Sequence, residues 1–207
     1  MKNNFLVECE DDLESIIGKP IEVVKQKLRK SLDDSMMEFI RRSPLIFLST
    51  VDDKGQVDIS PKGDSPGFVH VDEKGNLLIP DRPGNKLMFG FKNILKNRNV
   101  GVIFVVPDMR ETLRIKGQAS LSKDPSLLQD LSARGKPALL CTSVTISECF
   151  FHCGKAMIRS NMWNPDAWVA HHDSLMVRQL AKSLDADEEF ENVLEAQVEQ
   201  NYRDELY

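Results

Sequence analysis

One stretch decides how the sequence is interpreted: Leu77-Leu78-Ile79-Pro80-Asp81-Arg82-Pro83-Gly84-Asn85-Lys86. Its apolar start predicts a buried strand, and Asn85 is a residue type that favours the N-cap of a following helix. A helix start presents free backbone N–H groups and a positive dipole end, so with Arg82 and Lys86 it is suited to bind a phosphate. The stretch contains no Walker motif, Gly-x4-Gly-Lys-Ser/Thr. A surface turn whose charges are only solvated is the alternative interpretation.

The composition predicts one globular domain. The chain has 207 residues, of which 41% are hydrophobic and 29% are charged, as in soluble proteins with a sizeable core. Its net charge of −5 argues against a broad nucleic-acid surface. No run is apolar enough for a signal peptide or a membrane span, and the four cysteines are interpreted as reduced thiols. We therefore expect a cytoplasmic protein that binds neither nucleic acid nor a membrane.

Residues 1–44 are predicted to form an N-terminal helical segment that packs on a β-barrel domain formed by residues 45–163. Pro20 can open a helix whose apolar stripe continues to Leu32. Ser35 and Glu38 have the spacing of a capping box, which predicts the start of a second short helix.

Residues 45–163 have the pattern of strands. We expect strands over residues 45–51, 56–60, 68–71, 77–79, 100–106, 111–122 and 138–146, and a helix over residues 86–97. The prolines and glycines of residues 61–67 are expected to interrupt strand pairing. About six antiparallel strands with short helices between them favour a closed or partly closed β-barrel of the α+β class over a parallel sheet.

The segment 111–122 shows the clearest alternation of apolar and polar residues. Arg114 and Lys116 fall two residues apart on its polar face, where they can offer two donors to a flat, electron-rich ligand. A solvent-exposed face of an antiparallel sheet explains the same pattern equally well.

A second basic group follows the barrel. On a helix, Lys155 and Arg159 lie at i and i+4 on one face. The nearby Cys149, His152 and Cys153 have no second Cys/His pair at zinc-ligand spacing, so packing thiols are favoured over a metal site.

Residues 164–207 are predicted as a C-terminal helical, acidic extension with no catalytic motif. Its pattern predicts two helices, and the chain is strongly acidic beyond Asp185. We expect this tail to dock on the barrel or on a partner subunit. His171-His172 would complete a metal-ligand set with the cysteines only by chance of folding.

Six short motifs occur in an order that resembles a known family. They are Leu48-Ser49-Thr50-Val51, Asp58-Ile59-Ser60-Pro61-Lys62-Gly63-Asp64, Pro66-Gly67-Phe68, Ile79-Pro80-Asp81-Arg82-Pro83-Gly84-Asn85, Glu111-Thr112-Leu113-Arg114 and Phe150-Phe151-His152-Cys153-Gly154-Lys155-Ala156. Over residues 20–163 the chain resembles the pyridoxamine 5′-phosphate oxidase-like superfamily of FMN-binding split barrels, most closely its poorly characterised FMN-dependent branch. The resemblance implies a homodimer that holds FMN in clefts between its subunits.

The resemblance also implies which residues bind the cofactor. They are Arg82, Asn85 and Lys86 at the phosphate, Ser60 and Lys62 along the ring and ribityl chain, Arg114 and Lys116 beside the flavin, and Lys155 and Arg159 from the other subunit. No catalytic side chain is assigned, because the flavin N5 accepts the hydride.

The chain also departs from pyridoxamine phosphate oxidases proper. They have Arg-x-Val-Leu-Leu-Lys where this chain has Asp58-Ile59-Ser60-Pro61-Lys62-Gly63, and Arg-Leu-His where it has Ile158-Arg159-Ser160. These departures argue against vitamin B6 oxidation and leave an FMN-dependent oxidoreductase acting on a small molecule. The alternatives are a non-catalytic flavin-binding or flavin-sensing protein, and a split barrel that binds haem or a deazaflavin, with His152 or His70 as the haem ligand.

Overall fold

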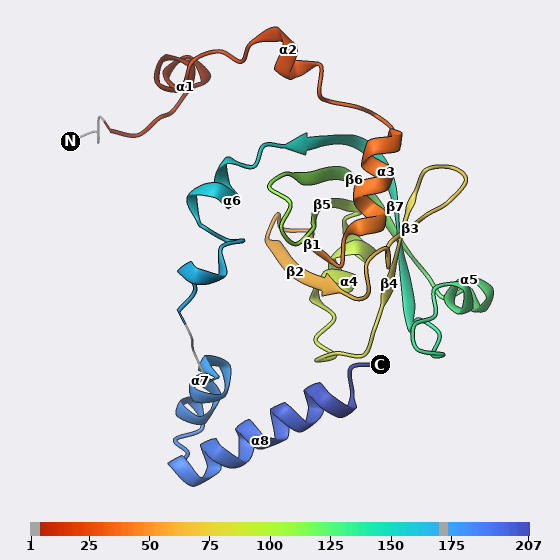
Figure 1. Cartoon of the computed structure of the whole chain (residues 1–207), viewed down its shortest axis with the longest axis vertical. Coiled ribbons are helices and arrows are strands. Elements are labelled where there is room, and N and C mark those ends of the chain that lie inside the picture. Colours follow the sequence, from red (N-terminus) through yellow and green to blue (C-terminus); the bar gives the residue numbers. More distant parts are fainter. Residues whose placement is uncertain (1–4, 170–173) are drawn as a thin grey trace.

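The computed structural model describes residues 5–169 and 174–207. Its seven strands form one antiparallel sheet that curls into a split barrel (Figure 1). The strands are β1 (Leu45–Val51), β2 (Val57–Gly63), β3 (His70–Val71), β4 (Leu77–Asp81), β5 (Asn99–Val105), β6 (Thr112–Ser122) and β7 (Leu140–His152). Their order across the sheet is β2-β1-β5-β6-β7-β4-β3. With its flanking helices this is the expected α+β split barrel.

Helices flank the sheet, some at the two ends of the chain and two between the strands. They are α1 (Glu10–Ile17), α2 (Glu22–Lys25), α3 (Asp34–Arg42), α4 (Phe89–Lys96), α5 (Pro125–Asp130), α6 (Lys155–Arg159), α7 (Leu175–Ser183) and α8 (Glu188–Asp204), with a 3-10 turn, η1 (Pro165–Ala167). Among these helices, none combines the length and the apolar character that a membrane span requires.

The N-terminal segment enters the core only at α3. The side chain of Asp33 accepts a hydrogen bond from the Met36 N–H, and Met36, Phe39 and Ile40 are buried. The expected capping box at Ser35 is therefore wrong, since the helix begins two residues earlier, behind an aspartate cap. The helix expected from Pro20 onward is also wrong: α2 is a single turn, and neither α1 nor α2 buries a residue. Figure 1 shows both lying away from the sheet.

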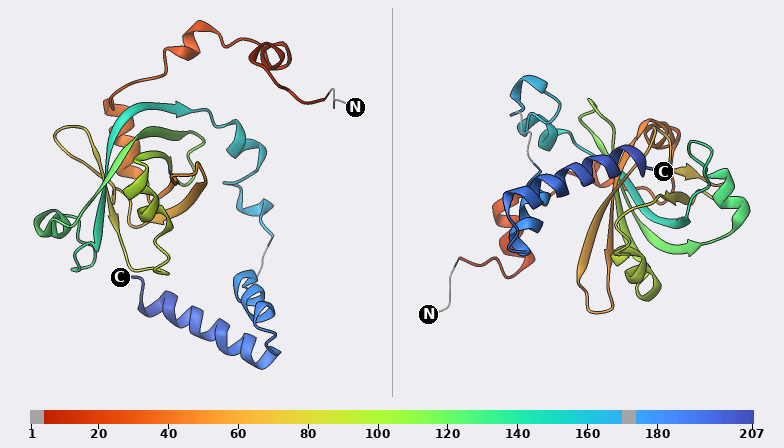
Figure 2. Two further views of the ribbon diagram at one scale, coloured as in Figure 1. Left: turned by 180° about the vertical axis from the view of Figure 1, so that it is seen from behind. Right: turned by 90° about the horizontal axis from the view of Figure 1, so that it is seen from below.

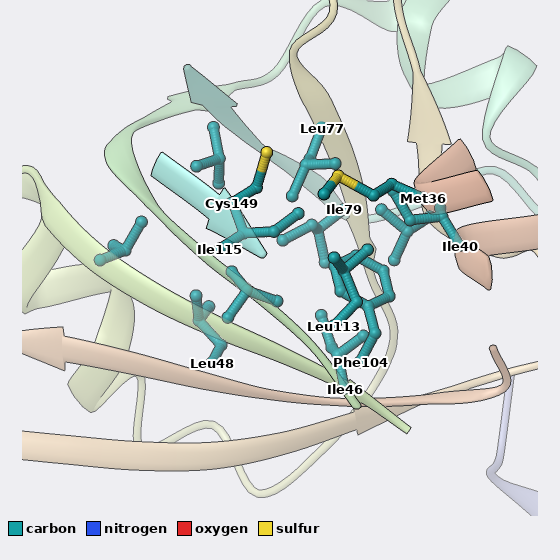
Figure 3. Packing of buried hydrophobic residues seen from close by; sticks show 14 of the residues in the cluster. Met36, Ile40, Ile46, Leu48, Leu77, Ile79, Phe104, Leu113, Ile115 and Cys149 are labelled. Atoms are coloured by element: carbon teal, nitrogen blue, oxygen red, sulfur yellow. The ribbon is translucent and has the colours of Figure 1, made fainter. Parts of the chain in front are cut away.

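The core lies between α3 and the concave side of the sheet (Figure 3). The alternation predicted for β6 is confirmed, because Leu113, Ile115 and Ala119 are at most 2% exposed while Lys116 is exposed. Burying each large side chain of this kind contributes roughly 1.5–3 kcal/mol.

A bulge bends the longest pair of strands. The register between β6 and β7 shifts between Lys116 and Gly117. A Cβ atom on Gly117 would lie 2.3 Å from the carbonyl oxygen of Thr145, so only glycine fits there. Bulges increase the local twist, which helps this sheet to curl.

Three sequence predictions at the edges of the elements are wrong. Residues 61–67 do not interrupt pairing at their start, because β2 stays paired with β1 to Gly63. Pro61 is tolerated since β2 is an edge strand. The strand expected to stop at residue 146 continues as β7 to His152, and the helix expected from residue 86 begins at Phe89.

The C-terminal extension forms a helical hairpin whose second helix returns toward the barrel. Ser174 caps α7 and Asp187 caps α8 through their side chains. Figures 1 and 2 show α8 running back so that the C-terminal end lies near the barrel. The contact is made by Tyr207, whose hydroxyl donates to Asp64.

Candidate functional site

The largest cavity described here is a cleft of about 800 Å³ between β2 and the loop that joins β4 to α4. This volume is within the range of small-molecule sites. Five of the nine sequence-predicted site residues line it: Ser60, Lys62, Arg82, Asn85 and Lys86. The fold therefore brings together the groups assigned to the phosphate and to the ring and ribityl chain.

Lys62 is held in the cleft by two contacts. Its Nζ lies 2.9 Å from Asp81 Oδ1 and 4.9 Å from the centre of the Phe91 ring. The side chains of Lys62 and Asp81 are only 18% and 19% exposed, so this charge pair is largely removed from water. A lysine fixed in this way offers a cation at one place instead of a diffuse positive field.

Arg82 is more deeply buried and is paired on only one side. Its Nε lies 2.8 Å from Asp64 Oδ2, and the two side chains are 15% and 3% exposed. Its Nη1 is buried and has no hydrogen-bond partner among the residues that the structure describes. A buried donor without an acceptor costs about 1–3 kcal/mol. An anionic ligand would supply the acceptor that this guanidinium lacks, so the cleft fits the phosphate of a nucleotide cofactor.

Asp64 is the carboxylate that fixes Arg82. Burial alone would raise its pKa, but hydrogen bonds from Tyr207, Arg82 and Ser65, together with the Arg82 charge, hold the pKa of Asp64 below its ordinary value. Asp64 is therefore an ionised, buried partner.

The loop after β4 has an unusual backbone. Lys86 and Met88 both have φ of 59°, in the left-handed region that non-glycine residues seldom adopt. Such residues cost of order 1–3 kcal/mol each and persist where the surroundings impose them, commonly at ligand sites. Asn85 does not cap a helix: its Oδ1 accepts the N–H of Leu87 within the loop, at 3.1 Å. The prediction that a helix begins at Asn85 and Lys86 and directs its dipole at the phosphate is therefore wrong. Only the side-chain cations of this loop can attract an anion there.

The other four predicted site residues do not line the cleft. On β6, the Arg114 guanidinium lies 5.3 Å from the centre of the Phe150 ring, and Lys116 Nζ lies 2.7 Å from Glu148 Oε1. Lys155 and Arg159 do share α6, as the spacing predicts, and both are exposed. These four residues lie outside the lining of the cleft, so their part in binding stays a prediction.

Sequence reasoning missed several partners of the basic residues. Asp81 and Phe91 hold Lys62, and Asp64 holds Arg82. Asp64 belongs to one of the six motifs. Nothing in the sequence, however, indicates that this acidic residue near the expected phosphate site orients Arg82. Tyr207 is 143 residues from Asp64, and no local pattern could have linked them.

The described residues contain no group of three or more His, Cys, Asp or Glu side chains that could hold a metal ion. Cys149 is buried and its Sγ lies 3.3 Å from the Ser31 carbonyl oxygen. Burial raises the pKa of the Cys149 thiol, and it raises that of Cys141 to about 11, so both are packing thiols. His171-His172 lie outside the described residues.

A curled antiparallel sheet with a basic cleft at its edge defines a split-barrel protein with a candidate small-molecule site. The family model described as pyridoxamine 5′-phosphate oxidase matches residues 32–153. The chain belongs to this family, as its motifs predict. The comparison with curated proteins found no match.

Solved structures with a similar barrel share little sequence with this chain. HupZ of Group A Streptococcus is 18% identical, with 58% of this chain and 93% of that chain covered and a TM-score of 0.47. An F420 reductase is 16% identical, with coverage of 57% and 98% and a TM-score of 0.43. HutZ, the heme storage protein from Vibrio cholerae, is 14% identical, with coverage of 59% and 94% and a TM-score of 0.41. These similarities carry no inference about ligand or activity.

Proposed function

We propose that this protein binds FMN in the cleft between β2 and the β4–α4 loop and is an oxidoreductase acting on a small molecule. The observation that carries the proposal is the buried Nη1 of Arg82, which has no acceptor among the described residues. The Arg82 side chain lines the cleft of a pyridoxamine 5′-phosphate oxidase family member. The FMN phosphate carries nearly two negative charges, which fixed guanidinium and ammonium donors bind strongly.

Each lining residue has a role in this proposal. Arg82, Asn85 and Lys86 hold the phosphate, while Ser60 and Lys62 lie along the ring and ribityl chain. Asp81 and Phe91 keep Lys62 in place, so that its cation stays at one site. Bound FMN would supply a hydride acceptor at its N5 atom, and a nearby cation would stabilise the reduced, anionic flavin.

Apolar side chains on the same loop suit the flat ring of a flavin. Leu87, Met88 and Phe89 are each at least 50% exposed and line the cleft. Exposed apolar side chains grouped at a cavity commonly mark a ligand or a protein contact. Here they would exclude water from the bound ring.

We further propose that the working unit is a homodimer. On the outer face of the sheet, paired residues form a continuous row from the edge of the cleft across five strands, Pro61, Phe47, Ile103, Arg114 and Phe150. Directly paired residues point to the same face. Arg114 therefore shares a face with exposed apolar side chains, and covering that face with a second copy would bring Arg114 and Lys116 near the partner's cleft. Lys155 and Arg159 would reach it in the same way.

The proposal is tested by the visible absorption spectrum of the purified protein, before and after FMN is added, and by titration of flavin fluorescence. We expect a bound-flavin spectrum and saturable quenching. A protein that remains colourless and leaves FMN fluorescence unchanged would refute the proposal. Light scattering on the same sample tests the dimer, and a monomer that retains FMN would contradict it.

Two alternatives are separated by the same sample. A non-catalytic flavin-binding or sensing protein would bind FMN without steady oxidation of NAD(P)H or an amine. A haem-binding or deazaflavin-binding split barrel would show a haem band or would prefer a deazaflavin. HutZ is named a heme storage protein, but His152 does not line the cleft here and His70 lines a polar pocket of only about 200 Å³. The free thiols are consistent with the cytoplasmic location that we propose.

A further inference from the structure

Tyr207, beyond the end of α8, is fixed to the barrel by three contacts. Its hydroxyl donates to Asp64 Oδ1 at 2.7 Å, and Lys136 Nζ donates to its main-chain oxygen at 2.5 Å. The Arg134 guanidinium carbon lies 4.4 Å from the centre of its ring. A phenol held by its hydroxyl, its ring and its main chain is placed specifically, in contrast to Tyr202 of α8, which is 53% exposed.

Asp64 connects this aromatic residue to the proposed phosphate site. Its Oδ1 accepts from the Tyr207 hydroxyl and from the Ser65 N–H, and its Oδ2 accepts from Arg82 Nε. The carboxylate is 3% exposed, so water can replace none of these donors at low cost. Tyr207, Asp64 and Arg82 therefore form a continuous, partly buried chain of hydrogen bonds.

Arg82 belongs to two cavities at once. It lines the 800 Å³ cleft, and it also lines the 200 Å³ polar pocket together with Asp64 and Arg134. The tyrosine docks on the side of the small pocket, while the proposed cofactor lies on the side of the cleft. Arg82 is thus the side chain through which docking of the C-terminal helix reaches the cleft.

We propose that Tyr207 is a positioning residue for the anionic group that binds in the cleft, acting through Asp64 on Arg82. This inference rests on the proposed function. The phenol hydrogen bond satisfies part of the Asp64 charge, which weakens the hold of that carboxylate on the guanidinium and leaves more of the Arg82 charge for an anion. The Asp64–Arg82 contact in turn keeps the guanidinium in one place, so less side-chain entropy is lost on binding.

The charges around Tyr207 favour docking. Arg134 and Lys136 contact Tyr207 directly, and Arg82 pairs with Asp64, which accepts the Tyr207 hydroxyl. The acidic helix therefore approaches a cationic part of the barrel.

The test compares Tyr207→Phe with Tyr202→Phe, using FMN and riboflavin as separate ligands. Tyr202→Phe is the matched control, because it removes a tyrosine hydroxyl from α8, five residues earlier in the chain. Removing one hydrogen bond to a charged partner is expected to raise the Kd for FMN roughly 3- to 10-fold in Tyr207→Phe. The Kd for riboflavin, which has no phosphate, is expected to stay unchanged in both variants, and Tyr202→Phe should bind FMN as the wild type does.

Three outcomes would overturn the positioning role: an unchanged Kd for FMN in Tyr207→Phe, an equal loss for FMN and riboflavin, or an equal loss in Tyr202→Phe. If the wild type binds neither flavin, the proposed function fails, and the positioning role fails with it. Amide hydrogen exchange without any flavin separates these failures. Faster exchange over residues 188–204 in Tyr207→Phe than in Tyr202→Phe would support docking of Tyr207 on Asp64, and equal exchange would overturn it.

Discussion

Replacing Arg82 by alanine should impair both folding and flavin binding, and the structure gives each effect a separate size. The variant leaves Asp64, 3% exposed, without its cation. Removing one partner of a buried ion pair typically costs about 3–5 kcal/mol. Asp64 keeps its hydrogen bonds from Tyr207 and Ser65, so we expect the lower end, about 3 kcal/mol, in the free energy of unfolding.

The loss of flavin affinity has another origin. A charge-assisted hydrogen bond to phosphate contributes roughly 1.5–3 kcal/mol, which corresponds to a roughly 10- to 150-fold higher Kd for FMN. Adding Lys86→Ala should remove a second contact of the same kind. Because Lys86 is exposed, that substitution should leave the unfolding free energy almost unchanged.

The assay combines urea unfolding in the absence of flavin with fluorescence titration of FMN. It uses four proteins: the wild type, Arg82→Ala, Asp64→Ala and the double variant that carries both Arg82→Ala and Asp64→Ala. Neutralising both partners should restore stability relative to Arg82→Ala, because no unpaired charge stays buried. It should not restore FMN affinity. A double variant that is less stable by the sum of the two single losses would refute the buried pair, and an unchanged Kd for FMN in Arg82→Ala would refute the phosphate site.

The remaining predictions concern packing, pH and assembly. Gly117→Ala should lower the unfolding free energy by about 1–3 kcal/mol or more, because its Cβ would meet the Thr145 carbonyl oxygen, whereas Gly84→Ala, with no atom within 4 Å, should be far milder in the same urea assay. The pKa of Asp64 is lowered in the folded protein, so the stabilisation that its charge provides is complete above the ordinary aspartate pKa of about 3.9 and is lost as the pH falls through the folded value. In Asp64→Asn the free energy of unfolding should therefore fall less steeply as the pH is lowered. An unchanged pH dependence at acid pH would contradict this. Val57→Lys should shift the dimer to monomer in light scattering. Val23 of α2 is equally exposed, at 63%, and Val23→Lys should cause no such shift. An equal shift in both variants would argue against the outer-face interface.

The barrel could be predicted from the sequence because its strands carry their own pattern. The alternation of β6 appears in consecutive residues, and the turns before β2 and β4 are marked by aspartate and glycine. The N-terminal helices were over-predicted for a related reason. An apolar stripe such as Ile21 and Val24 predicts a helix, but most helical stability comes from packing, and here both side chains are exposed.

The site could be predicted only as a set of basic residues. Asn85 is a good helix cap by local preference, yet Lys86 and Met88 take left-handed backbone angles that no local rule predicts, and the helix starts later. The partners that fix Lys62 and Arg82 come from separate strands and from the end of the chain. These contacts depend on the curling of the whole sheet, and so they could not be inferred from spacing.

The strand order also bears on how the protein folds. β1 and β2 form a hairpin, and β5, β6 and β7 follow one another as neighbours. Most strands that pair in the sheet are therefore also consecutive in the chain. Two pairings are different: Leu45 of β1 pairs with Val105 of β5, and Pro80 of β4 pairs with Cys141 of β7, across two helices and two strands. Long-range pairings incur their loop-closure entropy before they gain contacts, and they tend to form late. Because Arg82 directly follows β4, we expect the cleft to form late in folding. A ligand that binds there should then slow unfolding without accelerating folding.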